Sequence, residues 1–301
     1  MNLAQNELIK SGVVSLVGPP NVGKSTLLNT LLGQKISIVS PKPQTTRNRI
    51  LGILNDKSYQ IVVLDTPGIH DATAPLNKEM VRLAVETMSE VDVIVFMVDA
   101  SHSQPKREKS QFPRCLEEVK TPAILLINKI DLIGREKLLP LIEAYRIQHD
   151  FSAIVPVSAL KNDGTDLLLS ELLKLLPEGP RYYPEDIPTA ETERFIVQEI
   201  IREKVFLMTG QEVPYSTAVV IERFKEDVEK KLTTIDATII VEKNSQKGIV
   251  IGKGGKKLKE IGSAARLDIE KLLGQKVLLK IWVKVQKNWT RNPGFLKELG
   301  F

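Results

Sequence analysis

The chain has 301 residues, of which 42% are hydrophobic and 26% charged, with a formal net charge of +5. This length suggests two domains with cores of their own, and the composition is that of an ordinary globular protein. One cysteine, Cys115, excludes an internal disulfide and a cysteine-based zinc site. Because no apolar run approaches the ~18 residues that span a bilayer, and residues 1–10 lack a signal-peptide core, we expect a cytoplasmic protein.

The first half of the chain alternates short apolar runs with longer helical patterns. Strands are predicted at 12–17, 49–55, 59–64, 92–98, 123–127 and 152–157. Helices are predicted at 24–32, 76–89, 106–119, 136–147 and 163–176. This alternation predicts an α/β fold with a doubly wound, mostly parallel sheet, in which the second and third strands form an antiparallel hairpin. Ligands are expected at the carboxyl ends of the strands.

A boundary is predicted at 177–189, where four prolines and a glycine exclude a helix or a central strand. The expected bounds are 1–176 for the first domain, 190–286 for a smaller α+β domain, and 287–301 for a tail. In the second domain we predict a helix, two strands, a glycine loop between two helices, and a last strand. These elements fall at 190–206, 215–224, 233–242, 256–273 and 277–285, with the glycine loop just before 256.

The charge of the chain is concentrated near its C-terminus. Residues 243–297 hold 14 basic and 3 acidic side chains. An excess of this kind indicates an anionic macromolecular partner, although a solvated lysine-rich surface explains the charge alone equally well.

The first motif is Gly-Pro-Pro-Asn-Val-Gly-Lys-Ser at 18–25, which matches the G-x-x-x-x-G-K-[ST] phosphate-binding loop between a strand and a helix. Its glycines let the backbone wrap the phosphates, and the helix N-terminus adds free N–H groups. Lys24 is expected on the β- and γ-phosphates, and the Ser25 hydroxyl on Mg²⁺.

Two further motifs belong to the phosphate end of such a site. Asp65-Thr66-Pro67-Gly68 follows a predicted strand, so that Asp65 would hold Mg²⁺ and the Gly68 N–H would contact the γ-phosphate. The sequence Thr45-Thr46-Arg47 lies in the loop after the first helix. A threonine there can ligate Mg²⁺, and we favour Thr46 over Thr45.

Two motifs indicate guanine rather than adenine. Asn128-Lys129-Ile130-Asp131 follows a buried strand, and the Asp131 carboxylate can accept hydrogen bonds from guanine N1–H and the exocyclic amine. Lys129 would lie along the base, and a backbone N–H of Ser158-Ala159-Leu160 could read guanine O6. The expected GTP contacts are Gly18, Pro19, Pro20, Asn21, Val22, Gly23, Lys24, Ser25, Thr26, Asp65, Thr66, Pro67, Gly68, Ile69, Asn128, Lys129, Asp131, Ser158, Ala159 and Leu160.

These motifs, in this order, resemble the translation-factor-related class of small GTPases. The glutamine that orients the attacking water in Ras-like relatives is replaced by Ile69, and the next residue, His70, is better explained as an exposed polar side chain. The resemblance implies slow intrinsic hydrolysis and a potassium ion bound with help from Asn21. The expected catalytic residues are Lys24, Thr46, Gly68 and Asn21, and the expected metal ligands are Ser25, Thr46 and Asp65.

The second informative stretch is Gly252-Lys253-Gly254-Gly255, which joins an apolar helix to one with an apolar face. It resembles the KH module, in which a GxxG loop clamps a single-stranded nucleic-acid backbone. The preceding helix and two strands indicate the bacterial-type (type II) order. The expected RNA contacts are Ile251, Gly252, Lys253, Gly254, Gly255, Lys256 and Lys257. In the last strand and the tail, Trp282 is predicted to lie in the core, and Trp289 is left open between core and base stacking.

A GTPase domain followed by one such KH domain resembles the Era-type GTPases over essentially the whole chain. That resemblance implies GTP/GDP turnover, and binding of a monomer to small-subunit ribosomal RNA near its 3′ end during ribosome assembly. It also implies peripheral association with the cell membrane in some members. Two alternatives remain: a nucleotide-switched adaptor that binds a protein or an acidic membrane, and an RNA chaperone in which nucleotide only stabilises the fold.

Overall fold

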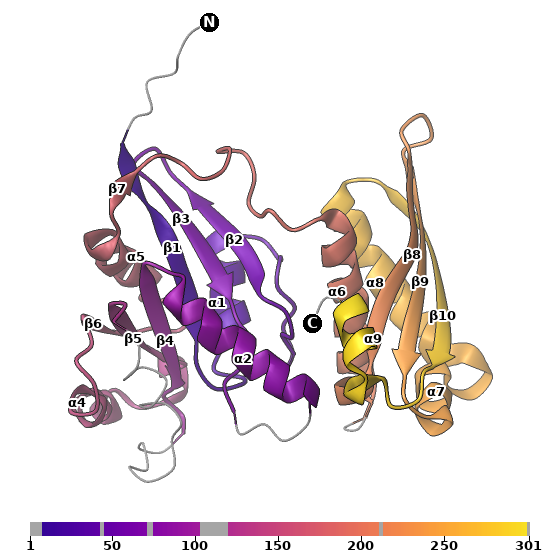
Figure 1. Cartoon of the computed structure of the whole chain (residues 1–301), viewed down its shortest axis with the longest axis horizontal. Coiled ribbons are helices and arrows are strands. Elements are labelled where there is room, and N and C mark those ends of the chain that lie inside the picture. The colour runs from indigo at the N-terminus through magenta and orange to yellow at the C-terminus, as the bar shows by residue number, and fades with distance from the viewer. Residues whose placement is uncertain (1–7, 43–44, 71–74, 103–119, 211–212, 300–301) are drawn as a thin grey trace, which may run out of the picture. The chain divides into compact units, whose positions relative to one another are not determined.

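A computed structural model describes residues 8–42, 45–70, 75–102, 120–210 and 213–299 (Figure 1). The chain divides into two compact units. The N-terminal unit comprises Met1–Ser37, Thr46–Ala72 and Lys78–Ala190, and the C-terminal unit comprises Ile38–Thr45, Thr73–Asn77 and Glu191–Phe301. The predicted helix at 106–119, with Cys115, lies outside the described residues.

The N-terminal unit is built on one sheet with the order β2-β3-β1-β4-β5-β6. Its strands are β1 (Ile9–Val17), β2 (Ile50–Asn55), β3 (Tyr59–Asp65), β4 (Val93–Asp99), β5 (Ala123–Asn128) and β6 (Ala153–Pro156). Strand β2 runs antiparallel to β3, whereas the other neighbours along this path are parallel. The predicted doubly wound, mostly parallel sheet with one hairpin is therefore confirmed.

Strands β4 and β5 form the centre of the core, because almost every side chain on them is buried. That burial on both faces accounts for their continuous apolar sequences. The helices of the unit are α1 (Lys24–Leu32), α2 (Pro75–Ser89, whose residues from Lys78 onward belong to this unit), α4 (Leu138–Arg146) and α5 (Thr165–Leu175). Helix α1 ends where Gly33 adopts a left-handed conformation with φ 65°. These helices place the loops at the carboxyl ends of the strands.

The proline-rich segment 177–189 is attached to the N-terminal unit. Its residues Glu178–Gly179 form a short strand, β7, which pairs antiparallel with the start of β1. This added pairing explains why β1 begins at Ile9, earlier than predicted. Further along, the Ile53 N–H donates to the Pro188 carbonyl at 2.8 Å. The two-residue strand lies at the sheet margin, where neighbouring prolines are tolerated.

The C-terminal unit has the predicted order of helix, two strands, two helices and a strand. Its elements are α6 (Glu193–Met208), β8 (Ala218–Asp227), β9 (Leu232–Val241), α7 (Asn244–Ile251), α8 (Lys256–Leu273), β10 (Lys276–Val285) and α9 (Pro293–Glu298). The sheet order is β10-β9-β8, with β9 parallel to β10 and antiparallel to β8. Strand β10 is therefore an edge strand.

The two tryptophans of this unit have opposite environments. Trp289 is fully buried, and its indole N–H donates to the Ser216 carbonyl at 3.0 Å. Trp282 is 51% exposed, so its predicted place in the core was wrong. The cause is the alternation of β10: Val277 and Val283 point inward and are buried, and the even-numbered positions point outward.

Candidate functional site

The phosphate loop requires three residues with positive φ. Gly18 and Gly23 have φ 150° and 104°, and Asn21 has φ 62°. A Cβ on Gly18 would lie 2.3 Å from the Met97 carbonyl oxygen, and one on Gly23 would lie 2.3 Å from Asn128 Nδ2. Both glycines are thus fixed by close packing against neighbouring strand ends. The resulting loop turns sharply between β1 and α1 and leads into the N-terminus of that helix.

Lys24, the first residue of α1, is buried and lies inside this loop. Its ammonium donates to the carbonyls of Gly18 at 3.2 Å and Pro19 at 3.0 Å. Burial lowers its pKa to about 8, and the field of Asp65 opposes that shift only in part. Within the described residues, neighbouring groups offset only part of the cost of burying this charge. A bound polyphosphate would stabilise it.

Hydroxyl groups converge on the Asp65 carboxylate at the end of β3. Ser25 Oγ donates to Asp65 Oδ2 at 2.6 Å, Ser37 Oγ donates to the same oxygen at 2.7 Å, and Thr46 Oγ1 lies 2.8 Å from Ser25 Oγ. Burial raises the pKa of Asp65, and its other oxygen, Oδ1, is buried without a hydrogen-bond partner. An orphaned carboxylate oxygen beside two hydroxyls suits a hard cation such as Mg²⁺.

The segment after β3 returns to the phosphate loop. A Cβ on Gly68 would lie 2.7 Å from Pro20 Cα, and the Ile69 N–H donates to the Gly18 carbonyl at 3.0 Å. The Ile69 side chain belongs to the hydrophobic core, so it carries no polar group into the site. His70 is half-buried, with Nδ1 2.8 Å from the Gly68 carbonyl. Residues 71–74 lie outside the described residues.

Asn128 joins the phosphate loop to the base-reading loop. Its Nδ2 donates to the Val22 carbonyl at 2.7 Å, and its Oδ1 accepts from the Ala159 N–H at 2.9 Å. The next residue, Lys129, adopts a left-handed conformation with φ 65°. Its ammonium lies 2.6 Å from Asp99 Oδ2, which fixes the lysine side chain at the end of β4.

The predicted guanine contacts lie beside each other. Ser158 Oγ donates to Asp131 Oδ1 at 2.6 Å, and the Asp131 side chain is exposed at the rim. The Ala159 carbonyl accepts from Thr30 Oγ1 of α1 at 2.8 Å, and Leu160 is 76% exposed. The remaining predicted contacts are placed along the same path: Pro19 and Pro20 at the loop surface, buried Val22, Thr26 in α1, and buried Thr66 and Pro67 after β3.

Three residues that tie the site together were missed in the sequence. Asp99 and Ser37 bind predicted site residues directly, and Asn29 orders the loop after α1 by accepting from the N–H groups of Ile36 and Ser37. Asp99 had a signal, because it ends a buried parallel strand, where ligand-site residues collect. Ser37 had none, since its partner Asp65 lies in a segment that only the fold brings close, and Asn29 had none, since its contacts depend on the path of the loop after α1.

The GxxG loop of the C-terminal unit lies between α7 and α8. Gly252, Gly254 and Gly255 all have positive φ, of 70°, 58° and 78°. Added Cβ atoms on Gly254 and Gly255 would meet nothing within 4 Å, so the loop surface is open to an approaching backbone. Lys253 and Lys256 are exposed, and Lys257 pairs with Glu260 at 3.6 Å. Ile251 precedes the loop and is half-buried.

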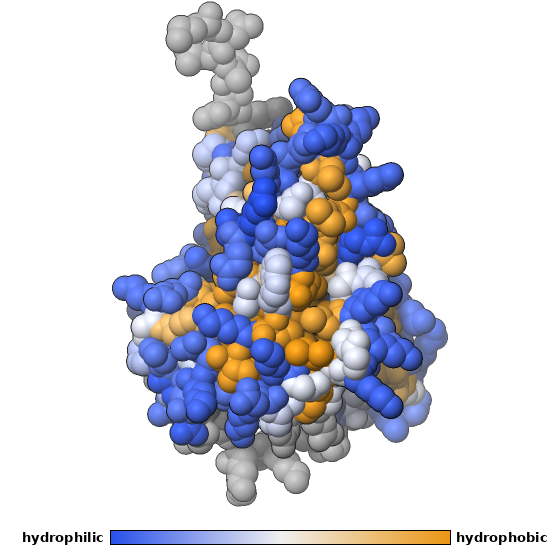
Figure 2. All heavy atoms as spheres, turned by 90° about the vertical axis from the view of Figure 1, so that its right-hand side faces the viewer, coloured by the Kyte–Doolittle hydropathy of each residue, from blue (hydrophilic) through white to orange (hydrophobic). Residues whose placement is uncertain are grey.

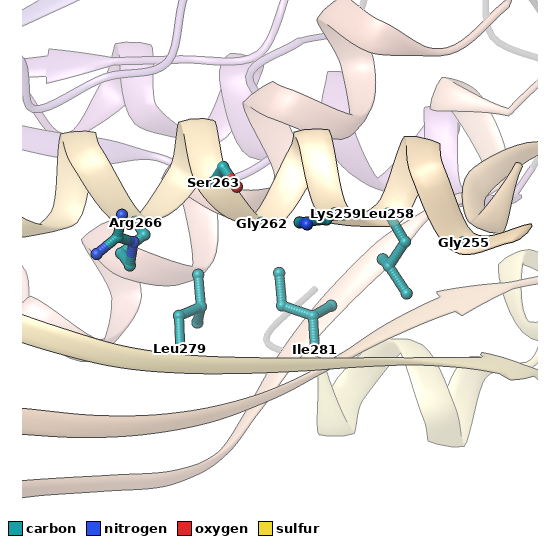
Figure 3. A pocket seen from close by; sticks show the side chains of 8 residues that line it. All are labelled: Gly255, Leu258, Lys259, Gly262, Ser263, Arg266, Leu279 and Ile281. Atoms are coloured by element: carbon teal, nitrogen blue, oxygen red, sulfur yellow. The ribbon is translucent and has the colours of Figure 1, made fainter.

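A groove continues from this loop between α8 and the edge strand β10 (Figure 3). Leu258 of α8 and Leu279 and Ile281 of β10 point into it, and Arg266 lies at its far end from Gly255. Gly262 leaves the middle of the groove without a side chain on the helix side. The groove therefore combines an apolar floor with a glycine loop and cations along its rim; its lining is completed by Lys259 and Ser263.

Known proteins match both units. A family profile described as "50S ribosome-binding GTPase" matches residues 13–129, and a KH domain profile matches 212–290. The GTPase Era of Syntrophus aciditrophicus is 51% identical over 294 residues, covering 98% of this chain and 96% of that protein. The GTPase Era of Geobacter metallireducens is 52% identical over 292 residues, covering 97% and 98%.

Two solved structures share the fold. A crystal structure of an Aquifex aeolicus Era variant bound to GDP·AlF4⁻ is 43% identical, with a TM-score of 0.93, and covers 97% of this chain and 99% of that chain. A structure of Era with MgGDPNP and nucleotides 1506–1542 of 16S ribosomal RNA is 44% identical, with the same TM-score and coverage. With both units and nearly the whole length matched at this identity, the chain belongs to the Era family of GTPases.

Proposed function

We propose that this chain binds GTP at residues 18–25, hydrolyses it, and binds the 3′ segment of small-subunit ribosomal RNA through its KH unit. The observation that carries the proposal is the convergence of Lys24, Ser25, Thr46 and Asp65 at the N-terminus of α1. Such a set of residues has no evident structural purpose, because it buries a cation and an orphaned carboxylate oxygen close together.

The catalytic contribution of the chain is electrostatic. Lys24 would exchange its carbonyl partners for the β- and γ-phosphates, and the Gly68 N–H would donate to the γ-phosphate. Mg²⁺, which Ser25, Thr46 and Asp65 would hold, supplies charge neutralisation between the phosphates when it is bound. Because Ile69 is in the core and His70 already contacts the Gly68 carbonyl, neither replaces the water-orienting glutamine. Slow intrinsic turnover follows.

A potassium ion would supply part of the missing charge. Asn21 supports this proposal, because it lies exposed at the tip of the phosphate loop with φ 62°, next to the expected phosphate position. GTP hydrolysis should be faster in potassium than in sodium buffer at equal ionic strength, and Asn21→Ala should abolish the difference. Equal hydrolysis rates for the wild-type chain in both buffers would contradict the proposed potassium site.

Guanine selectivity would rest on Asp131. Ser158 holds its carboxylate at the rim, and guanine N1–H and N2–H would compete for the same acceptor. The Lys129 stem, fixed by Asp99, would lie along the base, and the backbone of residues 158–160 would face O6. Adenine has neither donor at these positions, so with ATP the Asp131 carboxylate would keep only its hydrogen bond from Ser158.

The RNA would enter at the GxxG loop and follow the groove along α8. Its backbone would approach Gly254 and Gly255, where no Cβ obstructs it, and Lys253 and Lys256 would meet the phosphates. Unstacked bases would rest on the apolar floor of Leu258, Leu279 and Ile281. The related Era bound to nucleotides 1506–1542 of 16S ribosomal RNA supports the same partner here.

The test is GTP hydrolysis by the full chain with and without an oligonucleotide of the small-subunit rRNA 3′ end. We expect stimulation by this RNA, loss of stimulation in Lys253→Gln, and loss of all hydrolysis in Lys24→Ala. Normal GTP hydrolysis by Lys24→Ala would overturn the proposal.

Among the described residues no helix is long and apolar enough to cross a membrane. A cytoplasmic location, peripheral membrane association and a monomeric state stay predictions.

A further inference from the structure

The outer face of the C-terminal sheet, opposite the groove, carries an unusual row of side chains on β10. Five outward positions of this strand read Lys276, Leu278, Lys280, Trp282 and Lys284, and all five are exposed. Trp282 and Leu278 have 51% and 45% of their surface accessible. At the rise of an extended strand, the three lysines span about 27 Å. Figure 2 faces this side of the unit and shows apolar side chains bordered by hydrophilic ones.

The row is extended by cations on β8. The strand register places Arg223 and Lys225 on the same face as Lys280 and Trp282, across β9. None of these five cations is in an ion pair with the described residues. We call the three lysines of β10, Trp282, Arg223 and Lys225 together the basic face.

Carboxylates on this side do not neutralise it. Asp236 lies between Lys280 and Arg223 in the register, yet its Oδ1 atom is buried without a hydrogen-bond partner, and within the described chain it makes no ion pair shorter than 4.0 Å. Asp227, at the end of β8, pairs with Lys230 at 3.3 Å and also interacts with the charge of Lys225, so it offsets only part of the positive charge. The face therefore keeps a surplus of positive charge around an exposed indole.

We propose that the basic face binds single-stranded RNA that leaves the groove and crosses the edge strand β10. This inference rests on the RNA-binding function proposed above. The groove and the face share one strand, because Leu279 and Ile281 point into the groove while Lys280 and Trp282 point outward. Since a KH groove clamps about four nucleotides, a longer RNA must leave it.

The chemistry of the row fits a single strand. Bases stack on an exposed indole without regard to sequence, and lysines spaced along a strand meet successive phosphates. An acidic membrane is the competing partner, because it too attracts lysine and tryptophan. The spacing of the lysines along one strand, and the continuity of that strand with the groove, favour RNA.

The test uses the full chain and compares affinity for two single-stranded RNAs of the 3′-end sequence, one of about 6 and one of about 20 nucleotides, by fluorescence anisotropy. Trp282→Ala should weaken binding of the long RNA about tenfold and change the short RNA less than about twofold. Trp282→Phe retains an aromatic face and should restore most of the long-RNA affinity. Unchanged long-RNA affinity in Trp282→Ala would overturn the inference.

Charge variants provide the second readout. The double variant Lys280→Gln/Lys284→Gln should lower the slope of log affinity against log salt for the long RNA by about 1.4, as expected for two lost phosphate contacts on a single strand. Lys271→Gln, an exposed lysine of α8 away from the face, is the matched control and should leave the slope unchanged. An unaltered slope in the double variant would also overturn the inference.

Two further outcomes separate the possibilities. If Lys253→Gln leaves the affinity for both RNAs unchanged, the proposed groove is wrong and the inference is rejected with it. If Lys253→Gln weakens binding of the short RNA, the groove is supported, and the effect of Trp282→Ala on the long RNA then tests the basic face alone. Flotation with vesicles containing about 30% phosphatidylglycerol tests the competing partner. Vesicle binding lost in Trp282→Ala, with long-RNA affinity intact, would assign the face to the membrane and reject RNA.

Discussion

Lys24 offers a direct test of the electrostatics of the phosphate loop. Burial lowers the pKa of this lysine from 10.5 to about 8 in the folded chain, while in the unfolded chain it stays near 10.5. The folded state is therefore penalised for carrying the charge. The penalty is complete below pH 8 and disappears as the pH rises from about 8 to 10.5.

The size of the effect follows from the shift. One unit is 1.36 kcal/mol, so a lysine with these two pKa values costs the fold about 3 kcal/mol at pH 7.5 and about 1 kcal/mol at pH 10. Replacing it in Lys24→Met keeps a similar volume and removes the titration. Between pH 7.5 and pH 10, the free energy of unfolding of the nucleotide-free wild type should therefore rise by about 2 kcal/mol relative to that of Lys24→Met.

The assay is urea unfolding of the nucleotide-free wild type and Lys24→Met at pH 7.5, 8.5 and 10. Changes in packing and in hydrogen bonding to Gly18 and Pro19 shift the difference equally at each pH, so only its slope is diagnostic. Lys57→Met, at an exposed position outside the loop, is the control for replacing a lysine by methionine. A wild-type minus Lys24→Met difference that stays flat within about 0.5 kcal/mol would refute a depressed lysine pKa.

Three other substitutions test separate features. Asn128→Ala removes two buried hydrogen bonds of about 1 kcal/mol each, so GTP should bind about 10–30-fold more weakly in a fluorescent-nucleotide titration; unchanged affinity would show that the two loops hold without it. Gly68→Ala pushes a Cβ against Pro20, so hydrolysis should fall at least about tenfold in a phosphate-release assay, and retained activity would contradict the close approach. Trp289→Ala should lower the free energy of unfolding by about 3–5 kcal/mol, whereas the exposed Trp282→Ala should change it by about 1 kcal/mol or less; equal losses would contradict their burial.

Local chemistry made much of the N-terminal unit predictable. The phosphate loop, its strand and its helix are fixed by neighbours in sequence, and helix α1 begins and ends at the predicted residues, 24 and 32. The doubly wound, mostly parallel sheet with one hairpin followed from the alternation of strands and helices along the chain. The hydroxyls of Ser25 and Thr46 meet beside Asp65, as their motifs suggested.

What could not be predicted depends on contacts between distant segments. The pairing of Lys129 with Asp99 and of Ser37 with Asp65 requires the folded sheet. Trp282 is different, because the period of two residues along β10 places it on the same face as three lysines. The prediction for Trp282 followed the general tendency of large aromatic side chains to be buried. The alternation along β10 would have placed it correctly on the exposed face.

The short pairing of β7 with β1 has a practical consequence for dissecting this protein. Residues 177–190 supply the Glu178–Gly179 strand, the Pro188 carbonyl for Ile53, and the Tyr183 carbonyl that accepts from Gln60 at 2.8 Å. A fragment that stops at 176 would strip these partners from three strands at once. Researchers who wish to express the nucleotide-binding half by itself should keep the chain through Ala190, and fusion tags are better placed beyond that residue.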